Sequence, residues 1–174
     1  MVMKIHFDAI VEPGLNLEIN DVDWFPEGDC LRVGPVQAKL SLARRNRRVF
    51  VDGRLNFTCR FACDSCLELY DEVQDLPFTI AFDHLAANDP YWQSVEHQCP
   101  QAEMDVEVLS EPEIDIHAML AQQVVVSLPA KRLCSQSCRG LCPSCGINLN
   151  KEACSCRERA SNSPFQVLAN LKVK

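Results

Sequence analysis

The chain has 174 residues, of which 47% are hydrophobic and 24% charged, proportions that are ordinary for a soluble globular protein. Its formal net charge of −7 excludes a protein that binds polyanions over its whole surface, so nucleic-acid contact requires a local basic patch. No apolar run is long enough to span a membrane, and residues 1–15 lack the apolar core of a signal peptide. We therefore expect a cytoplasmic protein with no membrane partner, in a compartment where thiols stay reduced.

The N-terminal third of the chain predicts a short strand, a long connection and a β-hairpin. Residues 1–11 mix apolar and polar side chains as a strand does, and residues 12–34 are rich in Pro, Gly, Asn and Asp, which is typical of a surface loop. Between residues 36 and 57, apolar side chains alternate with polar ones in two runs. The turn that joins these runs contains four arginines: Arg44, Arg45, Arg47 and Arg48.

This arginine-rich turn has two interpretations. A charged turn keeps the end of a hairpin soluble and discourages pairing at its edge. Alternatively, four guanidiniums within five residues repel one another, and a bound phosphate group would relieve that repulsion. We take the turn as the main candidate for RNA contact, and add the three basic residues that flank the later cysteines: Lys131, Arg132 and Arg139.

Further strands and one helix complete the predicted body. Residues 68–82 alternate as a strand, and Val106 and Val108 predict a short additional strand. A helix is expected near 115–128, with Asp115 as its N-cap and Pro129 after its end. The β-branched run at 124–126 leaves a buried strand as the alternative for that part of the helix.

The fold class expected from these elements is α+β: a small antiparallel β-sheet body with one main helix and a C-terminal Cys-rich zinc-knuckle module. We expect the body to span residues 1–128 and the zinc-knuckle module residues 129–160. Residues 161–174 begin with a capping box that has proline at the first helical position, which predicts a short C-terminal helix packing on the body.

Eight of the eleven cysteines occur as close pairs with the spacing of metal ligands. We assign Cys142, Cys145, Cys154 and Cys156 to one local tetrahedral zinc site, and Cys63, Cys66, Cys134 and Cys138 to a second site closed over about seventy residues. One or two structural Zn²⁺ ions are therefore expected. The alternatives are a single zinc in the C-terminal module with Cys63 and Cys66 free, and an iron–sulfur cluster. Cys59 lies on the apolar face of its strand and is expected to be a buried core thiol.

The sequence offers no catalytic constellation. Closed sets of thiolates leave no open metal position for a reacting water, and the four histidines are scattered. Motifs for a nucleophile elbow, a phosphate-binding loop and a metalloprotease helix are absent from the sequence. We therefore expect no enzymatic activity and no small-molecule substrate.

Several of these segments, in the same order, resemble the large ribosomal RNA subunit accumulation proteins (YceD-like). The resemblance spans residues 36–174, and its most specific part is the knuckle around Gly140-Leu141-Cys142-Pro143. The other matching segments are Cys63–Glu68, Ile114–Ile116, Leu128-Pro129, Cys138–Gly146, Asn148–Asn150 and Ser163–Phe165 with Leu168 and Leu171. Cys59, Gln122 and Gln123 depart from the pattern of that family.

The resemblance implies a role in the accumulation of large-subunit ribosomal RNA and in ribosome assembly. It supplies no catalytic residue. We expect the partner to be that RNA or its precursor, or else a ribosomal protein. Two alternatives remain: a zinc-stabilised adaptor that binds a ribosomal protein without touching RNA, which the acidic net charge favours, and a thiol redox sensor.

Overall fold

The structure is a computed structural model that describes residues 3–28, 30–85 and 106–156. The chain forms two compact units. The first contains residues 1–61 and 71–130, and the second contains residues 62–70 and 131–174. The domain boundaries expected near residues 128 and 160 stay predictions, and the predicted C-terminal helix at 161–174 lies outside the described residues.

The main sheet of the first unit contains six strands. Their order is β2 (Leu15–Ile19), β4 (Gln37–Arg45), β5 (Arg48–Ala62), β6 (Leu69–His84) and β7 (Val106–Leu109), and β3 (Leu31–Arg32) pairs with β5 outside that path. β4 pairs with both β2 and β5 in antiparallel register. β7 pairs with β6 in parallel, so the sheet is mixed rather than purely antiparallel as predicted.

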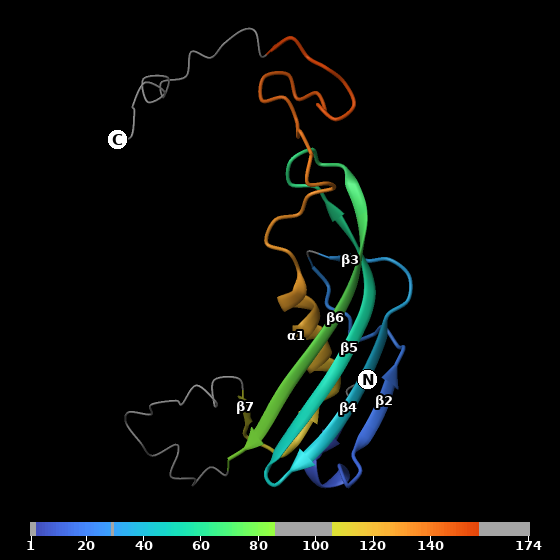
Figure 1. Ribbon diagram of the computed structural model, residues 1–174, viewed down its shortest axis with the longest axis vertical. Helices are drawn as coiled ribbons and strands as arrows, with labels where there is room; N and C mark the ends of the chain where they lie inside the picture. The colour runs from blue at the N-terminus through green and yellow to red at the C-terminus, as the bar shows by residue number, and fades with distance from the viewer. Residues whose placement is uncertain (1–2, 29, 86–105, 157–174) are drawn as a thin grey trace, which may run out of the picture. The chain divides into compact units, whose positions relative to one another are not determined.

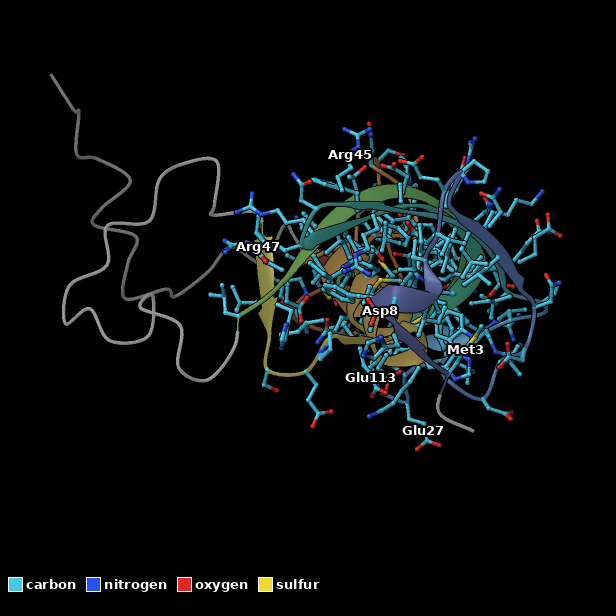
Figure 2. All side chains as sticks on the ribbon, turned by 90° about the horizontal axis from the view of Figure 1, so that it is seen from below. Met3, Asp8, Glu27, Arg45, Arg47 and Glu113 are labelled. Carbon is cyan, nitrogen blue, oxygen red and sulfur yellow. A yellow bond between two sulfur atoms is a disulfide. The ribbon has the colours of Figure 1, made fainter. Side chains whose placement is uncertain are left out.

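A second, two-stranded sheet precedes the helix. It pairs β1 (Lys4–His6) with β8 (Glu113–Asp115), and β1 leads directly into the 3₁₀ turn η1 (Phe7–Ala9). The helix α1 (Ile116–Ser127) begins where β8 ends, and the Asp115 side chain caps it by accepting a hydrogen bond from the Ala118 amide. The helix prediction is therefore confirmed over the β-branched run as well. The main sheet curves around α1 (Figures 1 and 2).

The core of the first unit lies between the sheet and α1. It contains the apolar residues that alternate along β4 and β5, such as Leu42 and Leu55, and the helix residues Ile116, Leu120 and Val124, all at most 3% exposed. Gly53 lies on this face by the alternation of β5, and the ring of Phe78 occupies the space that a Cβ atom would need there. The hairpin predicted from the period-two pattern is confirmed in this packing. No helix in the described part of the chain is both long and apolar enough to cross a membrane.

Two expectations from the sequence are wrong. Residues 12–34 are not a simple surface connection, because β2 and β3 lie within them and Ile19 and Trp24 are buried. Cys59 is fully buried as predicted, but it is not a free thiol: it forms a disulfide with Cys30 across the β3–β5 pairing. The spacing of 29 residues gave no local signal for that bond.

Candidate metal centres and arginine turn

Two cysteine pairs in the second unit adopt the same turn. In the first, the Leu67 amide donates to the Cys63 carbonyl and the Cys63 amide donates to the Glu68 carbonyl. In the second, the amide of Gly146 donates to the carbonyl of Cys142, whose own amide donates to Ile147. The residue after the second cysteine has a positive φ in both turns, 61° at Leu67 and 72° at Gly146. Each turn therefore presents two sulfurs from one tight corner of backbone.

The first cysteine group contains Cys63, Cys66, Cys134 and Cys138, whose sulfurs all lie within 4.8 Å of one another. The Cys63–Cys138 and Cys66–Cys134 sulfur pairs are 3.8 and 3.6 Å apart. Sulfurs bound to one zinc at about 2.3 Å form a tetrahedron whose edge is about 3.8 Å. The donor set and its spacing thus fit a four-coordinate zinc ion.

The second cysteine group contains Cys142, Cys145, Cys154 and Cys156, and its four sulfurs also lie within 4.8 Å of one another. The hairpin that carries the first two cysteines is closed by a bridge between Leu141 and Asn148. The structure therefore brings all eight predicted metal ligands together in two groups of four, divided as their spacing suggested. Each group can hold one metal ion.

The thiols of the first group differ in how readily they ionise. Burial acts to raise the pKa of Cys63, but the backbone amides of Cys134, Cys66 and Ser65 hydrogen-bond to its sulfur and lower that pKa to about 6. The hydrogen bond with the Cys66 thiol, together with burial, raises the pKa of Cys134 to about 12. Without a cation, the four sulfurs cannot all be thiolates near neutral pH, because each new negative charge opposes the next.

The second group behaves in the same way. Amides of Cys145 and Ser144 lower the pKa of Cys142 to about 6, whereas the hydrogen bond with the Cys145 thiol raises the pKa of Cys156 to about 11. One thiolate is therefore available to start metal binding in each group. A divalent cation would supply the charge that allows the remaining thiols to lose their protons.

Polar contacts that the sequence did not reveal surround the first group. The Asn150 side chain donates from Nδ2 to the Cys138 sulfur at 3.3 Å, and its Oδ1 accepts from the Arg139 amide at 2.8 Å. Glu68 accepts from Lys151 at 2.7 Å and from Asn148 at 3.3 Å. These contacts connect the loop of the second group with the first group. Asn150 and Glu68 were missed in the sequence because neither belongs to the paired cysteine pattern that marks the two groups.

Replacing Asn150 with alanine is expected to weaken metal binding by the first group. The substitution removes the only side-chain amide that donates to a ligand sulfur within the described residues, and losses of this kind typically lower metal affinity by about 10- to 100-fold. Competition with a chromophoric chelator measures the two affinities. Ser144→Ala is the matched control because it alters an exposed side chain beside Cys145 and leaves the backbone amide in place. Equal affinities in Asn150→Ala and wild type would show that Asn150 does not support the site.

Leu67→Gly is expected to stabilise the first turn. A non-glycine residue at a φ of 61° costs about 1–2 kcal/mol, and the Leu67 side chain is 65% exposed, so little packing is lost. Because glycine adds flexibility to the unfolded chain, we expect a net gain of about 0.5–1 kcal/mol. The reverse change, Gly146→Leu, should destabilise the second turn. Hydrogen exchange of the Leu67 and Gly146 amides measures both effects, and slower exchange in Gly146→Leu would contradict the strain argument.

The arginine turn, residues 44–48, joins β4 to β5 through Asn46 and Arg47, with Asn46 at a φ of 57°. Arg44 donates from Nη1 to Asp8 at 2.6 Å, and this hydrogen bond holds the pKa of Asp8 below its ordinary value. The guanidinium of Arg45 lies 5.6 Å from the centre of the Phe50 ring. Figure 2 looks onto this end of the first unit, where Arg45 and Arg47 point outward.

Arg47 and Arg48 share one carboxylate. Both donate from Nε to Oδ2 of Asp83, at 3.0 and 2.9 Å, and the Asp83 side chain is only 3% exposed. The chain itself thus relieves part of the mutual repulsion of the arginines, which we had expected an external anion to relieve. Among the described residues the four guanidiniums face two carboxylates, so this part of the chain leaves the turn with a net positive charge.

The three other basic candidates lie in the second unit. Arg132 holds the chain before Cys134 against the first turn, because its amide donates to Asp64 Oδ2 and its carbonyl accepts from the Asp64 amide. Arg139 is exposed and lines a cavity of about 540 Å³ that also reaches Cys142 and Cys154. Lys131 is exposed. The structure therefore separates the predicted RNA contacts into a turn in one unit and residues near the cysteines in the other.

Comparison with known proteins identifies a protein family that matches this chain. The family model described as "Large ribosomal RNA subunit accumulation protein YceD" matches residues 51–172, which include both cysteine groups and α1 but not the arginine turn. The chain is also similar to "Large ribosomal RNA subunit accumulation protein YCED homolog 1, chloroplastic" of Arabidopsis thaliana, with 25% identity over 179 residues that cover 87% of this chain and 51% of the relative. It thus spans about half the length of that relative, and no solved structure matches it. Because the matched region exceeds half of its residues, the chain belongs to the family of large ribosomal RNA subunit accumulation proteins, YceD.

Proposed function

We propose that this protein is a non-enzymatic, zinc-binding factor that supports the accumulation of large-subunit ribosomal RNA and ribosome assembly. The observation that carries the proposal is the pair of four-sulfur groups in the region that matches the family. Two closed metal sites would fix the fold of the second unit, whose described residues contain no regular helix and only one bridge outside the ends of β5 and β6.

We assign zinc to these groups, because four-sulfur tetrahedra hold zinc or iron and the cysteine spacing does not follow the ferredoxin run of an iron–sulfur cluster. All eight donors are cysteine sulfurs, no histidine or carboxylate joins either set among the described residues, and the Cys63–Cys138 and Cys66–Cys134 separations match the edge of a tetrahedron around zinc. Such closed sets leave no position for a reacting water, which supports a structural role for the ions. Metal analysis that found iron in place of zinc would redirect the assignment to iron–sulfur chemistry.

RNA contact is assigned to the arginine turn, with Lys131, Arg132 and Arg139 as additional contacts. The turn concentrates four guanidiniums on a chain whose net charge is −7, so the attraction for a phosphate backbone is local. Phosphate contacts of this kind position a protein on RNA without reading bases. The arginine turn lies outside the region that the family model matches, so the proposal rests on the charge and geometry of the turn and not on the family match.

Crosslinking in growing cells tests the proposal. The attached RNA is sequenced and the crosslinked peptides are identified. We expect reads concentrated on large-subunit ribosomal RNA, with crosslinks at the residue 44–48 turn. RNA crosslinks spread over unrelated transcripts, or crosslinks confined to other surfaces, would contradict the assignment.

A protein-binding adaptor is the second candidate function. The observation in its favour is the acidic net charge, because ribosomal proteins are basic and would be attracted to such a surface. The two candidate functions predict different results when the protein is purified from cells with its partners and then treated with nuclease. A ribosomal protein that stays bound after complete RNA digestion favours the adaptor, whereas loss of all ribosomal proteins favours RNA contact.

A further inference from the structure

We infer that Asp83 is a positioning residue, which holds Arg47 and Arg48 side by side so that both face a phosphate group of the bound RNA. The inference rests on the proposed function and deepens it, because it adds to the RNA site an acidic residue that charge alone would exclude. The observation behind it is a difference in hydrogen-bond geometry among the arginine–aspartate contacts of the first unit.

Two arginines elsewhere in the main sheet form closed ion pairs. Arg60 donates from Nε and Nη2 to the two carboxylate oxygens of Asp71, at 2.6 and 2.7 Å. Arg54 contacts both oxygens of Asp75 in the same way. Each of these pairs satisfies the carboxylate completely and occupies two nitrogens of its guanidinium, so it is a self-contained link across the sheet.

The contact at Asp83 is built differently. Two guanidiniums use only Nε, and both reach the same oxygen, Oδ2. Oδ1 is buried and has no hydrogen-bond partner among the described residues. A buried carboxylate oxygen without a partner costs stability, so the arrangement is poorly explained as a stabilising ion pair.

The open geometry leaves the donors that an anion needs. With Nε engaged, the terminal nitrogens Nη1 and Nη2 of both guanidiniums have no hydrogen-bond partner within the described residues, and the side chains of Arg47 and Arg48 are 58% and 30% exposed. Two neighbouring guanidiniums can then bind one phosphate group through several parallel hydrogen bonds. Asp83 also offsets the repulsion between the two guanidiniums. Because it already holds both side chains in place, RNA binding removes less side-chain entropy than it would from two mobile arginines.

Asp83→Asn distinguishes this role from simple electrostatics. The substitution removes a negative charge beside the arginines, so attraction between charges alone predicts tighter RNA binding. A positioning role predicts weaker binding, about threefold to tenfold, because the amide oxygen that remains accepts more weakly than a carboxylate oxygen and no longer offsets the repulsion between the two guanidiniums. Asp75→Asn is the matched control: it makes the same charge change in the same sheet, at the closed Arg54 pair, and should leave affinity unchanged or slightly higher.

The affinity is measured with the full chain and a large-subunit ribosomal RNA transcript. NMR spectra of the arginine Nε–H groups report whether the two side chains are held in the free protein, and we expect these signals to broaden in Asp83→Asn only. Arg47→Lys/Arg48→Lys gives an independent test, because it keeps the charge and should also weaken binding. It serves as the deciding variant if Asp83→Asn does not fold.

The outcomes separate the inference from the proposed function. Equal or tighter RNA binding by Asp83→Asn, with its Nε–H signals intact, overturns the positioning role while RNA binding by the wild type stands. Unchanged affinity in the double lysine variant overturns it as well. If the wild-type protein does not bind the transcript, the proposed function fails and the inference fails with it.

Discussion

Cys63→Ser is expected to reduce the zinc content of the purified protein from two ions per chain to one. The serine oxygen cannot replace a thiolate in a four-sulfur site, and the remaining three cysteines of the first group lose the amide-stabilised sulfur whose pKa is about 6. Structural zinc contributes roughly 10–16 kcal/mol of apparent binding energy to small zinc-dependent folds. This exceeds the stability of many domains, about 5–15 kcal/mol. Local unfolding of residues 62–70 and 131–138 should therefore accompany the loss.

Three matched variants make this result specific. Cys145→Ser should also leave one zinc, because the ion is then lost from the second group and kept in the first, and the double variant should leave none. Ser144→Ala should keep both ions because it changes no ligand. Elemental analysis counts the ions and hydrogen exchange locates the unfolding. A wild-type protein with less than about half an equivalent of zinc, or single variants that retain two ions, would refute the assignment of both sites.

The unfolding should stay within the second unit. The first unit has its own apolar core around α1, and the Cys30–Cys59 disulfide lies within it. Its amides are therefore expected to remain protected in Cys63→Ser. Loss of protection at Leu55 and Leu120 together with the first cysteine group would show instead that the metal supports the whole chain.

The ligand pairs were predictable because metal chemistry restricts sequence strongly. Two cysteines separated by two residues can bind the same ion only from a tight turn. The spacing of Cys63–Cys66 and Cys142–Cys145 therefore predicts, from the local sequence alone, two turns that each present a pair of sulfurs. The sequence does not show that the two turns are alike, because Leu67 occupies the left-handed position that Gly146 occupies in the other turn. Propensity does not predict a leucine there, and the hydrogen bonds of the turn determine its conformation.

Other features depended on contacts between distant segments, which single-sequence patterns do not encode. The Cys30–Cys59 disulfide joins a residue just before a two-residue strand to the C-terminal part of β5, and β3 itself is too short to show periodicity. Asn150 meets Cys138 only because two loops of the second unit lie together. Asp83 follows the alternating run of residues 68–82 and belongs to no motif, whereas the structure keeps it in β6 and brings it to two arginines.

Neutralising the arginine turn is expected to weaken RNA binding more than neutralising other basic residues of the first unit. Replacing Arg44, Arg45, Arg47 and Arg48 with glutamine should lower affinity for a large-subunit ribosomal RNA transcript by at least about tenfold at low salt. It should also flatten the plot of log affinity against log salt. The expected change in slope lies between about 1.4 and about 2.8, the values for two and four released counterions on single-stranded RNA. The lower value applies if Asp8 and Asp83 already offset two of the charges.

A control of equal charge decides whether position matters. The quadruple glutamine variant of Lys4, Lys39, Arg54 and Arg60 removes the same charge from basic residues of the same unit, each of which already pairs with a carboxylate. If the turn contacts phosphate, its variant should lose more affinity and more salt dependence than this control. Equal losses in the two variants would mean that only the net charge of the chain acts on the RNA. In that case the turn would be a solubilising end of the hairpin, and the acidic surface of the adaptor model would become the better explanation.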